Sequence, residues 1–538
     1  MNAAISSRVS KIWTGGTSGL DLSGLGIQIG HWEAGGLALT THQELAGKVT
    51  HAENEAVSSH STHTACTMIG EGIDQDARGS APNATIVSRR SNNDEAEIAS
   101  FGALGGLLSN HSYSTGNPNG DIPLYGHYTE NAAEWDEILF NAPYLTLCKS
   151  AGNTRNDGVN TGDNGYDLLY TVATCKNLLT IGAINDVLNY TGPQSITHSA
   201  FSTWGPTDDW RIKPDLTANG VSLYSADDDS DTDYTVKSGT SMSTPSVTGA
   251  IALLQEHYHN QNSVYMKAAT VKALLLGTTD EAGDNDGPDF QHGWGLINAE
   301  RAAGVISNHG ITSRINELSL TNGSTYTADI EVDGSSPLSL TIAWTDPQGT
   351  PVSTGILDNL TPMLVNDLDV RITKSAAVYY PWKMTPNSSS NNFDFAATKG
   401  DNFRDNVERI DINSLPAGIY TVTVTHKNTL VNGFQDFSMM INGISPNQVS
   451  TENFGQGNSL LVYPNPSNKG YFNVKISNDW DVDNYEIQII DLLGKVRMNN
   501  LYSEQQVKLN VSHLDSGIYI IRIKTEKGEY KQLLKIEN

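Results

Sequence analysis

Residues 239–245 read Gly-Thr-Ser-Met-Ser-Thr-Pro and stand directly before an apolar segment. The apolar positions of that segment follow helical spacing: Ala250, Ile251, Leu253 and Leu254. We therefore predict a buried helix that begins near Ser241. A serine at a helix N-terminus can serve as a nucleophile, because the helix dipole favours negative charge there and small neighbours let a substrate approach. The same stretch also suits an ordinary N-cap followed by proline, and by itself it does not decide between the two.

Short apolar segments alternate with helical patterns through the first 300 residues. Segments 26–30, 84–88, 145–148 and 178–183 are typical of buried strands, and 95–108 and 131–140 of helices. Strand–helix alternation predicts an α/β fold in which helices cover both faces of a parallel sheet.

Two further segments carry residues suited to acyl transfer. Residues 60–67 read His-Ser-Thr-His-Thr-Ala-Cys-Thr, and residues 150–153 read Ser-Ala-Gly-Asn at the end of a predicted strand. A hydroxyl nucleophile needs a base, an acid that orients the base, and donors for the oxyanion. His60 and His63 could instead share a helix face and bind a metal, although no third ligand with suitable spacing follows. Asn153 is either a turn former or a carboxamide donor at the edge of the sheet.

Together these motifs resemble those of the subtilisin-like serine peptidases. Residues 60–67, 150–153 and 239–245 match that family in order and spacing, as do 77–82, 213–215 and 292–299. The resemblance covers about residues 20–303 and implies a catalytic domain at 20–305, after an N-terminal extension at 1–19. It implies that Ser241 is the nucleophile, His60 the general base and acid, and Asn153 the oxyanion donor. It requires no cofactor for the chemistry.

The chain departs from the family at the orienting acid. Where the family has an Asp after its first strand, residues 30–36 read Gly-His-Trp-Glu-Ala-Gly-Gly, so we expect Glu33 to take that role. Cys66 replaces a family glycine, and we expect it to be inert packing. The resemblance also implies a cleft that pairs with an extended peptide. The residues expected to line it are Ser112, Tyr113, Ser114, Ser150, Ala151 and Gly152.

From about residue 311 the apolar period changes to two, as in 338–344 and 420–425, which predicts an all-β sandwich. Residues 311–445 resemble the jelly-roll-like β-sandwich that follows the catalytic domain in one subgroup of these peptidases. Members of that subgroup often bind calcium, so a structural calcium is one reading of four acids in this segment. The other reading is that they are solvated loop acids. The four residues are Asp367, Asp369, Asp405 and Glu408.

The last 79 residues differ from the rest in charge. Residues 460–538 hold 10 acidic and 10 basic residues, so the net charge of −27 lies entirely before them. A polar stretch at 446–459 is typical of a linker. Residues 460–538 form a predicted small all-β domain that resembles the C-terminal sorting domain of the type IX secretion system of Bacteroidetes, through 462–466, 491–495 and 514–519. This implies the type IX machinery as a partner and a secreted or cell-surface location. Such export also needs a signal peptide, and the family usually carries a propeptide; neither is recognisable in this chain.

Composition excludes some classes of function. The acidic balance, with a pI near 4.7, disfavours nucleic-acid and membrane-surface binding, and no apolar run is long enough for a transmembrane helix. Three cysteines are too few for a disulfide framework, and the state of Cys148 and Cys175 stays open. The leading hypothesis is a secreted serine endopeptidase that hydrolyses proteins or peptides. The alternatives are a degenerate peptidase fold used for binding, and a β-sandwich adhesin.

Overall fold

The structure is a computed structural model. It describes residues 1–114, 122–354, 356–386, 393, 395–446, 452–455, 460–463, 467, 470–476, 484–491, 495–504, 506–525 and 528–536. Most of the predicted linker 446–459 and parts of two sorting-domain motifs, 464–466 and 492–494, lie outside these residues. The chain divides into two compact units: residues 1–323 with 329–450, and residues 324–328 with 451–538.

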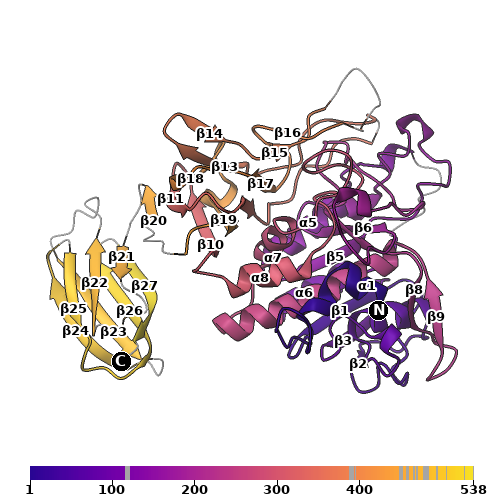
Figure 1. Ribbon diagram of the computed structural model, residues 1–538, viewed down its shortest axis with the longest axis horizontal. Helices are drawn as coiled ribbons and strands as arrows, with labels where there is room; N and C mark the ends of the chain where they lie inside the picture. Colours follow the sequence, from indigo (N-terminus) through magenta and orange to yellow (C-terminus); the bar gives the residue numbers. More distant parts are fainter. Residues whose placement is uncertain are drawn as a thin grey trace. The chain divides into compact units, whose positions relative to one another are not determined.

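A seven-stranded parallel sheet forms the centre of the N-terminal half (Figure 1). Its strand order is β2-β3-β1-β4-β5-β6-β7. The strands are β1 (Gln28–Glu33), β2 (Val49–His51), β3 (Thr85–Arg90), β4 (Leu108–His111), β5 (Thr146–Ser150), β6 (Leu179–Ile184) and β7 (Leu216–Asn219). The four predicted strands are confirmed. The helix predicted over 95–108 ends earlier, at Ala103, because Leu108 already begins β4.

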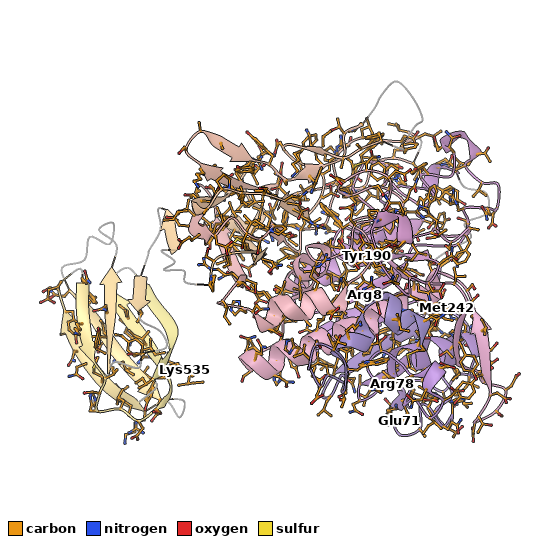
Figure 2. The ribbon with its side chains drawn as sticks, viewed as in Figure 1. Arg8, Glu71, Arg78, Tyr190, Met242 and Lys535 are labelled. Carbon is orange, nitrogen blue, oxygen red and sulfur yellow. The ribbon has the colours of Figure 1, made fainter. Side chains whose placement is uncertain are left out.

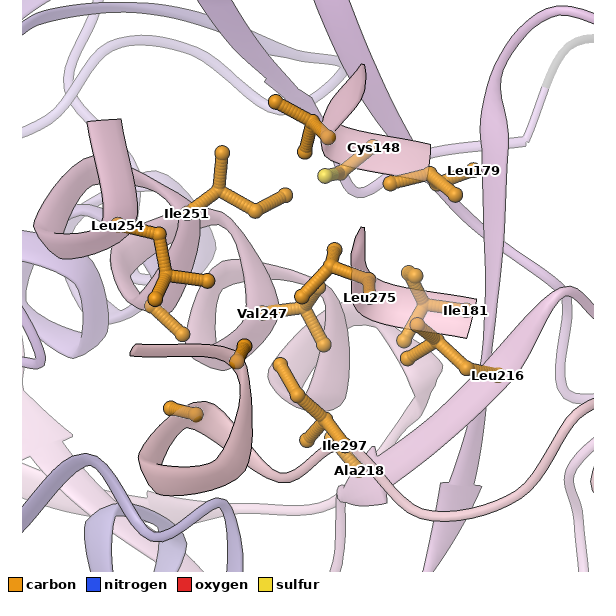
Figure 3. Close-up of a cluster of buried hydrophobic side chains, with 14 of the residues drawn as sticks. Cys148, Leu179, Ile181, Leu216, Ala218, Val247, Ile251, Leu254, Leu275 and Ile297 are labelled. Carbon is orange, nitrogen blue, oxygen red and sulfur yellow. The ribbon is translucent and has the colours of Figure 1, made fainter. Parts of the chain in front are cut away.

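Helix α6 (Thr240–Asn262) covers one face of this sheet and packs against β4, β5, β6 and β7. Figure 3 shows the contact: Val247, Ile251 and Leu254 of the helix face apolar side chains from the strands. The strand residues in this contact include Cys148, Leu179, Ile181, Leu216 and Ala218. Helices α3 (Ser59–Ile69) and α8 (Ala299–Ser307) also pack on α6, so the helix is enclosed.

The opposite face of the sheet is covered by α4 (Asp94–Ala103) and α5 (Glu130–Asn141). A separate apolar cluster lies there, with Leu147 from β5, Phe101 from α4 and Trp135 from α5. Because strand side chains alternate between faces, Leu147 joins this cluster and Cys148 joins the α6 side. The predicted α/β architecture with helices on both faces is therefore confirmed.

The N-terminal residues are part of the same unit. Helices α1 (Asn2–Ser6) and α2 (Val9–Ile12) pack against β7 and α8, respectively. The Arg8 side chain, which Figure 2 labels next to Tyr190, lies 5.7 Å from the centre of that ring and forms an ion pair with Asp280.

The β-sandwich follows α8 and belongs to the first unit, except for β20 and the first residues of β11, which fall in the second. One sheet has the order β10-β19-β12-β17 and the other β14-β13-β18-β11-β20. Their strands are β10 (Ser313–Thr321), β11 (Thr325–Val332), β12 (Leu338–Ala343), β13 (Leu368–Lys374), β14 (Ala377–Tyr379), β17 (Val407–Ile412), β18 (Gly418–His426), β19 (Phe434–Asn442) and β20 (Glu452–Gly455). Helix α7 (Ala268–Leu276) packs on β12 and β19 and so joins this sandwich to the peptidase-like half.

The second unit is all-β, as predicted. Its two sheets have the orders β21-β22-β25 and β24-β23-β26-β27. The strands are β21 (Leu460–Tyr463), β22 (Tyr471–Ile476), β23 (Tyr485–Asp491), β24 (Val496–Tyr502), β25 (Gln506–Asn510), β26 (Gly517–Thr525) and β27 (Gly528–Ile536). Phe472, Ile487 and Ile521 are among the buried residues of its own core.

Minor elements complete the chain. They are the hairpin β8 (Leu223–Ala226) with β9 (Tyr234–Lys237), the pair β15 (Trp382–Lys383) with β16 (Thr398–Lys399), and short 3₁₀ turns. The three cysteines are free and buried. Among the described residues, no helix combines the length and apolarity that crossing a bilayer requires.

The packing of α6 can be tested by cavity formation. Ile251 is fully buried, so Ile251→Ala should lower the free energy of unfolding by about 2–5 kcal/mol. Leu104 is 88% exposed, and Leu104→Ala should stay within about 0.5 kcal/mol of the parent. Urea denaturation of both variants gives the comparison. Equal losses would show that α6 is not the centre of the core.

Candidate active site

The Glu33 carboxylate lies at the end of β1 and contacts three polar groups. Its Oε2 atom is 2.9 Å from Nδ1 of His60, which is the second residue of α3. Its Oε1 atom is 3.3 Å from Nε2 of His31 and accepts a hydrogen bond of 3.0 Å from the Thr64 hydroxyl. The structure thus brings together the base and the acid that we predicted from the sequence.

The electrostatics of this contact favour an ion pair. Burial opposes ionisation of Glu33, but the nearby His60 and His31 outweigh it and lower the Glu33 pKa to about 2. The Glu33 carboxylate raises the pKa of His60, against the opposing effect of burial. An imidazolium at His60 is therefore stabilised by Glu33, as a general base that accepts a proton requires.

Ser241 lies in the first turn of α6 and is half-buried. Its hydroxyl donates a hydrogen bond of 3.1 Å to the backbone oxygen of Ser112 rather than to His60. The next residue, Met242 (Figure 2), is buried, with 2% of its surface exposed. Catalytic hydrogen bonds are often formed only once substrate is bound, so a rotation of the Ser241 side chain toward His60 is compatible with this geometry.

The orientation of Asn153 is fixed by the start of α6. Its Oδ1 atom accepts hydrogen bonds from the Thr240 amide, at 2.8 Å, and from the Thr240 hydroxyl, at 3.1 Å. The same hydroxyl accepts a hydrogen bond from the Gly152 amide. Since Oδ1 is occupied by these donors, the exposed Asn153 presents its Nδ2 donor to a substrate.

A cavity of about 250 Å³ lies beside Ser241 and Asn153. Five of the six predicted substrate-binding residues line it: Tyr113, Ser114, Ser150, Ala151 and Gly152. The sixth, Ser112, is buried and contributes the backbone oxygen that Ser241 contacts. Leu168 and Tyr170 also line the cavity, and the sequence analysis did not identify them.

Lys149 is a further residue of this cavity that we did not predict. It is 3% exposed, and its ammonium group donates to the backbone oxygen of Tyr113 and, at 3.4 Å, to the Ser150 hydroxyl. Burial lowers its pKa to about 8. Lys149 therefore connects the two strand ends that carry the predicted substrate-binding residues.

His63 and Cys66 of the 60–67 motif lie away from this site and are buried. His63 is buried, its Nε2 is 3.0 Å from the Leu223 backbone oxygen, and burial lowers its pKa to about 4. His60 and His63 do not converge with further ligands among the described residues. Cys66 is buried, and burial raises the pKa of its thiol to about 11, which makes it unreactive.

The predicted calcium ligands lie in two places. Asp367, Asp369 and Glu408 lie near one another, and Asp401 joins them. Lys427 and Arg371 contact these acids, with Lys427 Nζ 3.0 Å from Asp367 and 2.7 Å from Asp401. Asp405 lies elsewhere and accepts a hydrogen bond of 2.8 Å from the Ile212 amide. One oxygen each of Asp367 and Glu408 is buried without a hydrogen-bond partner among the described residues, so this oxygen-rich set fits calcium.

Comparison with known proteins matches residues 38–295 to the subtilase family. These residues belong to the subtilase family of serine peptidases. Residues 461–537 match the secretion system C-terminal sorting domain, which is the type IX sorting domain. The subtilase match begins after Glu33, so the role of Glu33 rests on its geometry.

Two curated relatives are similar to the subtilase domain. Serine protease AprX of Bacillus subtilis is 25% identical over 53% of this chain and 68% of its own length. Subtilisin DY of Bacillus licheniformis is 25% identical over 52% of this chain and 92% of its own length. Among solved structures, the prenylagaramide maturation protease PagA is 20% identical, with a TM-score of 0.39 over 52% of this chain and 93% of that chain.

The Glu33–His60 contact has a testable pH signature. In the Ser241→Ala protein, His60 should titrate above its usual pKa of 6.5, and Glu33→Gln should move that titration to lower pH. His63, which is neutral because it is buried, should keep its low pKa and serves as the internal control. Histidine NMR titration measures both residues. An unchanged His60 pKa in Glu33→Gln would contradict the ion pair.

The same shifts predict how stability depends on pH. The raised pKa of His60 stabilises the fold fully below 6.5, and this contribution is lost as the pH rises through the folded-state pKa. The lowered pKa of Glu33 stabilises the fold above 4.5, and this contribution is lost as the pH falls toward about 2. The contribution of the pair is therefore largest between about pH 4.5 and 6.5.

Proposed function

We propose that the chain is a secreted serine endopeptidase that hydrolyses protein substrates through an acyl-enzyme on Ser241. The observation that carries this proposal is the 2.9 Å contact between Glu33 and His60, next to a cavity lined by Ser241 and Asn153. The subtilase-family match supports the reaction class.

In the proposed mechanism, His60 accepts the Ser241 proton as the hydroxyl oxygen attacks the substrate carbonyl carbon. Glu33 holds the imidazole through Nδ1 and stabilises its positive charge. His60 then gives the proton to the leaving amine, and the C–N bond breaks. A water molecule, deprotonated by His60, then attacks the acyl carbonyl carbon. His60 returns this proton to the Ser241 oxygen as the ester C–O bond breaks, which releases the second product.

The negative charge on the attacked oxygen meets two donors. Asn153 Nδ2 is oriented toward it by the hydrogen bonds that Thr240 makes to Oδ1. The backbone amide of Ser241 has no hydrogen-bond partner among the described residues and points from the N-terminus of α6, where the helix dipole is positive. Both donors are fixed before the reaction, which is what makes an oxyanion site effective.

Two other functions fit parts of the chain. A degenerate peptidase fold could act as a binding module, and a β-sandwich could act as an adhesin. A binding module has no use for Glu33, His60, Ser241 and Asn153 held in these positions, so the geometry favours the enzyme. Casein hydrolysis by the purified chain, absent in Ser241→Ala, distinguishes the enzyme from both alternatives.

A series at residue 33 tests the proposed catalytic acid. Glu33→Gln keeps the shape but can favour the wrong imidazole tautomer, so turnover of a peptide substrate should fall by about 10³- to 10⁴-fold. Glu33→Asp should also be impaired, because the shorter side chain would not reach His60. Active-site labelling by a fluorophosphonate, with Ser241→Ala as the blank, reports whether Ser241 is activated. A rise in turnover with Glu33→Asp, or no loss with Glu33→Gln, would reject this assignment.

The sorting domain supports a secreted or cell-surface location and the type IX machinery as a partner. Asp367, Asp369 and Glu408 stay our proposal for a structural calcium, with Asp401 as a further ligand, whereas Asp405 lies apart from this set. Calcium bound there would stabilise the sandwich and take no part in the chemistry.

The sorting domain can be separated from the chemistry. A stop after Gly457 removes residues 458–538, which belong to the second compact unit, so peptidase activity should be unchanged while surface delivery is lost. Full-length Ser241→Ala is the matched control: it should reach the surface but be inactive. Cell fractionation and casein hydrolysis measure the two properties. If the truncated protein is folded but has lost most of its activity, the two functions are not separable.

A further inference from the structure

Three aspartates from distant parts of the first unit meet beside Gly126. One carboxylate oxygen from each of Asp167, Asp208 and Asp358 lies within 4.8 Å of the other two. Asp167 and Asp208 are buried, with 4% and 8% of their surface exposed, whereas Asp358 is exposed. The first two belong to the subtilase domain, and Asp358 lies between β12 and β13 of the sandwich.

Each buried carboxylate has one oxygen held and one oxygen without a partner. Asn160 donates a hydrogen bond of 3.0 Å to Oδ2 of Asp167, and His127 Nδ1 is 3.1 Å from Oδ2 of Asp208. The Oδ1 atoms of both aspartates are buried without a hydrogen-bond partner among the described residues. Both Oδ1 atoms approach Gly126 so closely that a methyl group there would collide with each of them. The two Oδ1 atoms, which lack hydrogen-bond partners among the described residues, therefore both lie next to Gly126.

The charge of this cluster is not balanced by the protein. Among the described residues, no lysine or arginine forms an ion pair with these three aspartates, and His127 is the one basic partner. Burial, and then the charges of Asp208 and Asp358, raise the pKa of Asp167 well above its usual range. The sandwich cluster differs, because Lys427 and Arg371 already neutralise part of its charge. Buried acids without a cation are costly, so a bound cation would relieve this cluster.

We propose that Asp167, Asp208 and Asp358 bind a calcium ion. The available donor atoms are carboxylate oxygens, which calcium prefers and which suit zinc or copper less well. Calcium also tolerates the irregular arrangement that three separate segments produce, whereas magnesium demands near-octahedral geometry. Asn160 and His127 orient the ligands through the oxygens that do not face the ion, as outer partners of metal ligands commonly do.

The ion would connect the sandwich to a wall of the active-site cavity. Asp167 is followed by Leu168, which lines the cavity, and the Asp167 amide is bonded to the Gly205 backbone oxygen. The Asp208 amide donates a hydrogen bond to the Gly126 backbone oxygen. The Gly126 amide in turn donates one to the Leu169 backbone oxygen. A calcium ion shared with Asp358 would therefore hold the sandwich segment against the loop that carries Leu168. This inference does not depend on the proposed peptidase activity.

The test uses the full chain with Ser241→Ala, stripped of metal with EGTA, and titrated with CaCl₂ or MgCl₂ by calorimetry and thermal unfolding. We expect calcium to bind and to raise the unfolding temperature. Asp358→Asn and Asp208→Asn should each weaken this binding by at least about tenfold. In EGTA the Asp208→Asn protein should be as stable as the parent or more stable, because one repulsive charge is gone. Unchanged or higher stability in EGTA shows that Asp208→Asn removes a ligand, because a variant with a damaged fold would be less stable than the parent.

Two controls define the site. Asp229→Asn makes the same charge change at an exposed position outside the cluster and should leave calcium binding unchanged. Asp401→Asn removes an acid of the sandwich cluster, so it should leave this site intact even if that cluster binds a second ion. Because Asp358 is exposed, Asp358→Asn gives an answer even if Asp208→Asn fails to fold. The proposal would be overturned if Asp358→Asn and folded Asp208→Asn kept the calcium affinity and stoichiometry of the parent. It would also be overturned if the metal-free parent did not respond to calcium, or if it preferred magnesium.

Discussion

The enclosure of α6 is the constraint on which the rest of the first unit depends. The structure describes every residue from Thr240 to Tyr258, and each of them except Ser241 is buried. A helix that is buried all round cannot lie on a surface, so it must be covered by the sheet and by other helices. This fixes the position of its N-terminus, which carries Ser241 and holds Asn153 through Thr240. The core therefore positions the candidate nucleophile and the candidate oxyanion donor together.

The positions of Glu33 and His60 follow from the periodicities of a strand and a helix. His31 and Glu33 are two residues apart on β1, so their side chains share one face of the strand. His60 and Thr64 are four residues apart on α3, so their side chains share one face of the helix. Where these faces meet, His31, His60 and Thr64 surround the Glu33 carboxylate. A fully buried carboxylate is tolerable there because each of its oxygens contacts a polar neighbour.

Much of this arrangement could be predicted from the sequence. The apolar strands, the buried helix after Ser241 and the period-two segments are local patterns, and the structure contains them. Residues 415–420 read Leu-Pro-Ala-Gly-Ile-Tyr and residues 514–519 read Leu-Asp-Ser-Gly-Ile-Tyr, and the two segments share a local contact. Tyr420 and Tyr519 each donate a hydrogen bond to the backbone oxygen four residues earlier. Their glycines differ, because Gly418 has a φ of 138° whereas Gly517 lacks a positive φ. The approach of Asp358 to Asp167 and Asp208 was not predictable, since these residues are far apart and belong to no motif.

The interface between the subtilase domain and the sandwich, like the candidate active site, holds a buried acid paired with a basic side chain. Lys176 and Asp346 are both fully buried and form an ion pair across this interface. Lys176 also donates to the Met363 backbone oxygen, and Asp346 accepts from the amides of Val365 and Asn366, so neither charge is left unpaired. Removing one partner of such a pair strands a buried charge, which costs about 3–5 kcal/mol. The sequence shows a change of period near residue 311, but it cannot show that charges on either side of that change neutralise each other. The sandwich is therefore a structural part of the peptidase unit, and the sorting domain, which forms its own unit, is not.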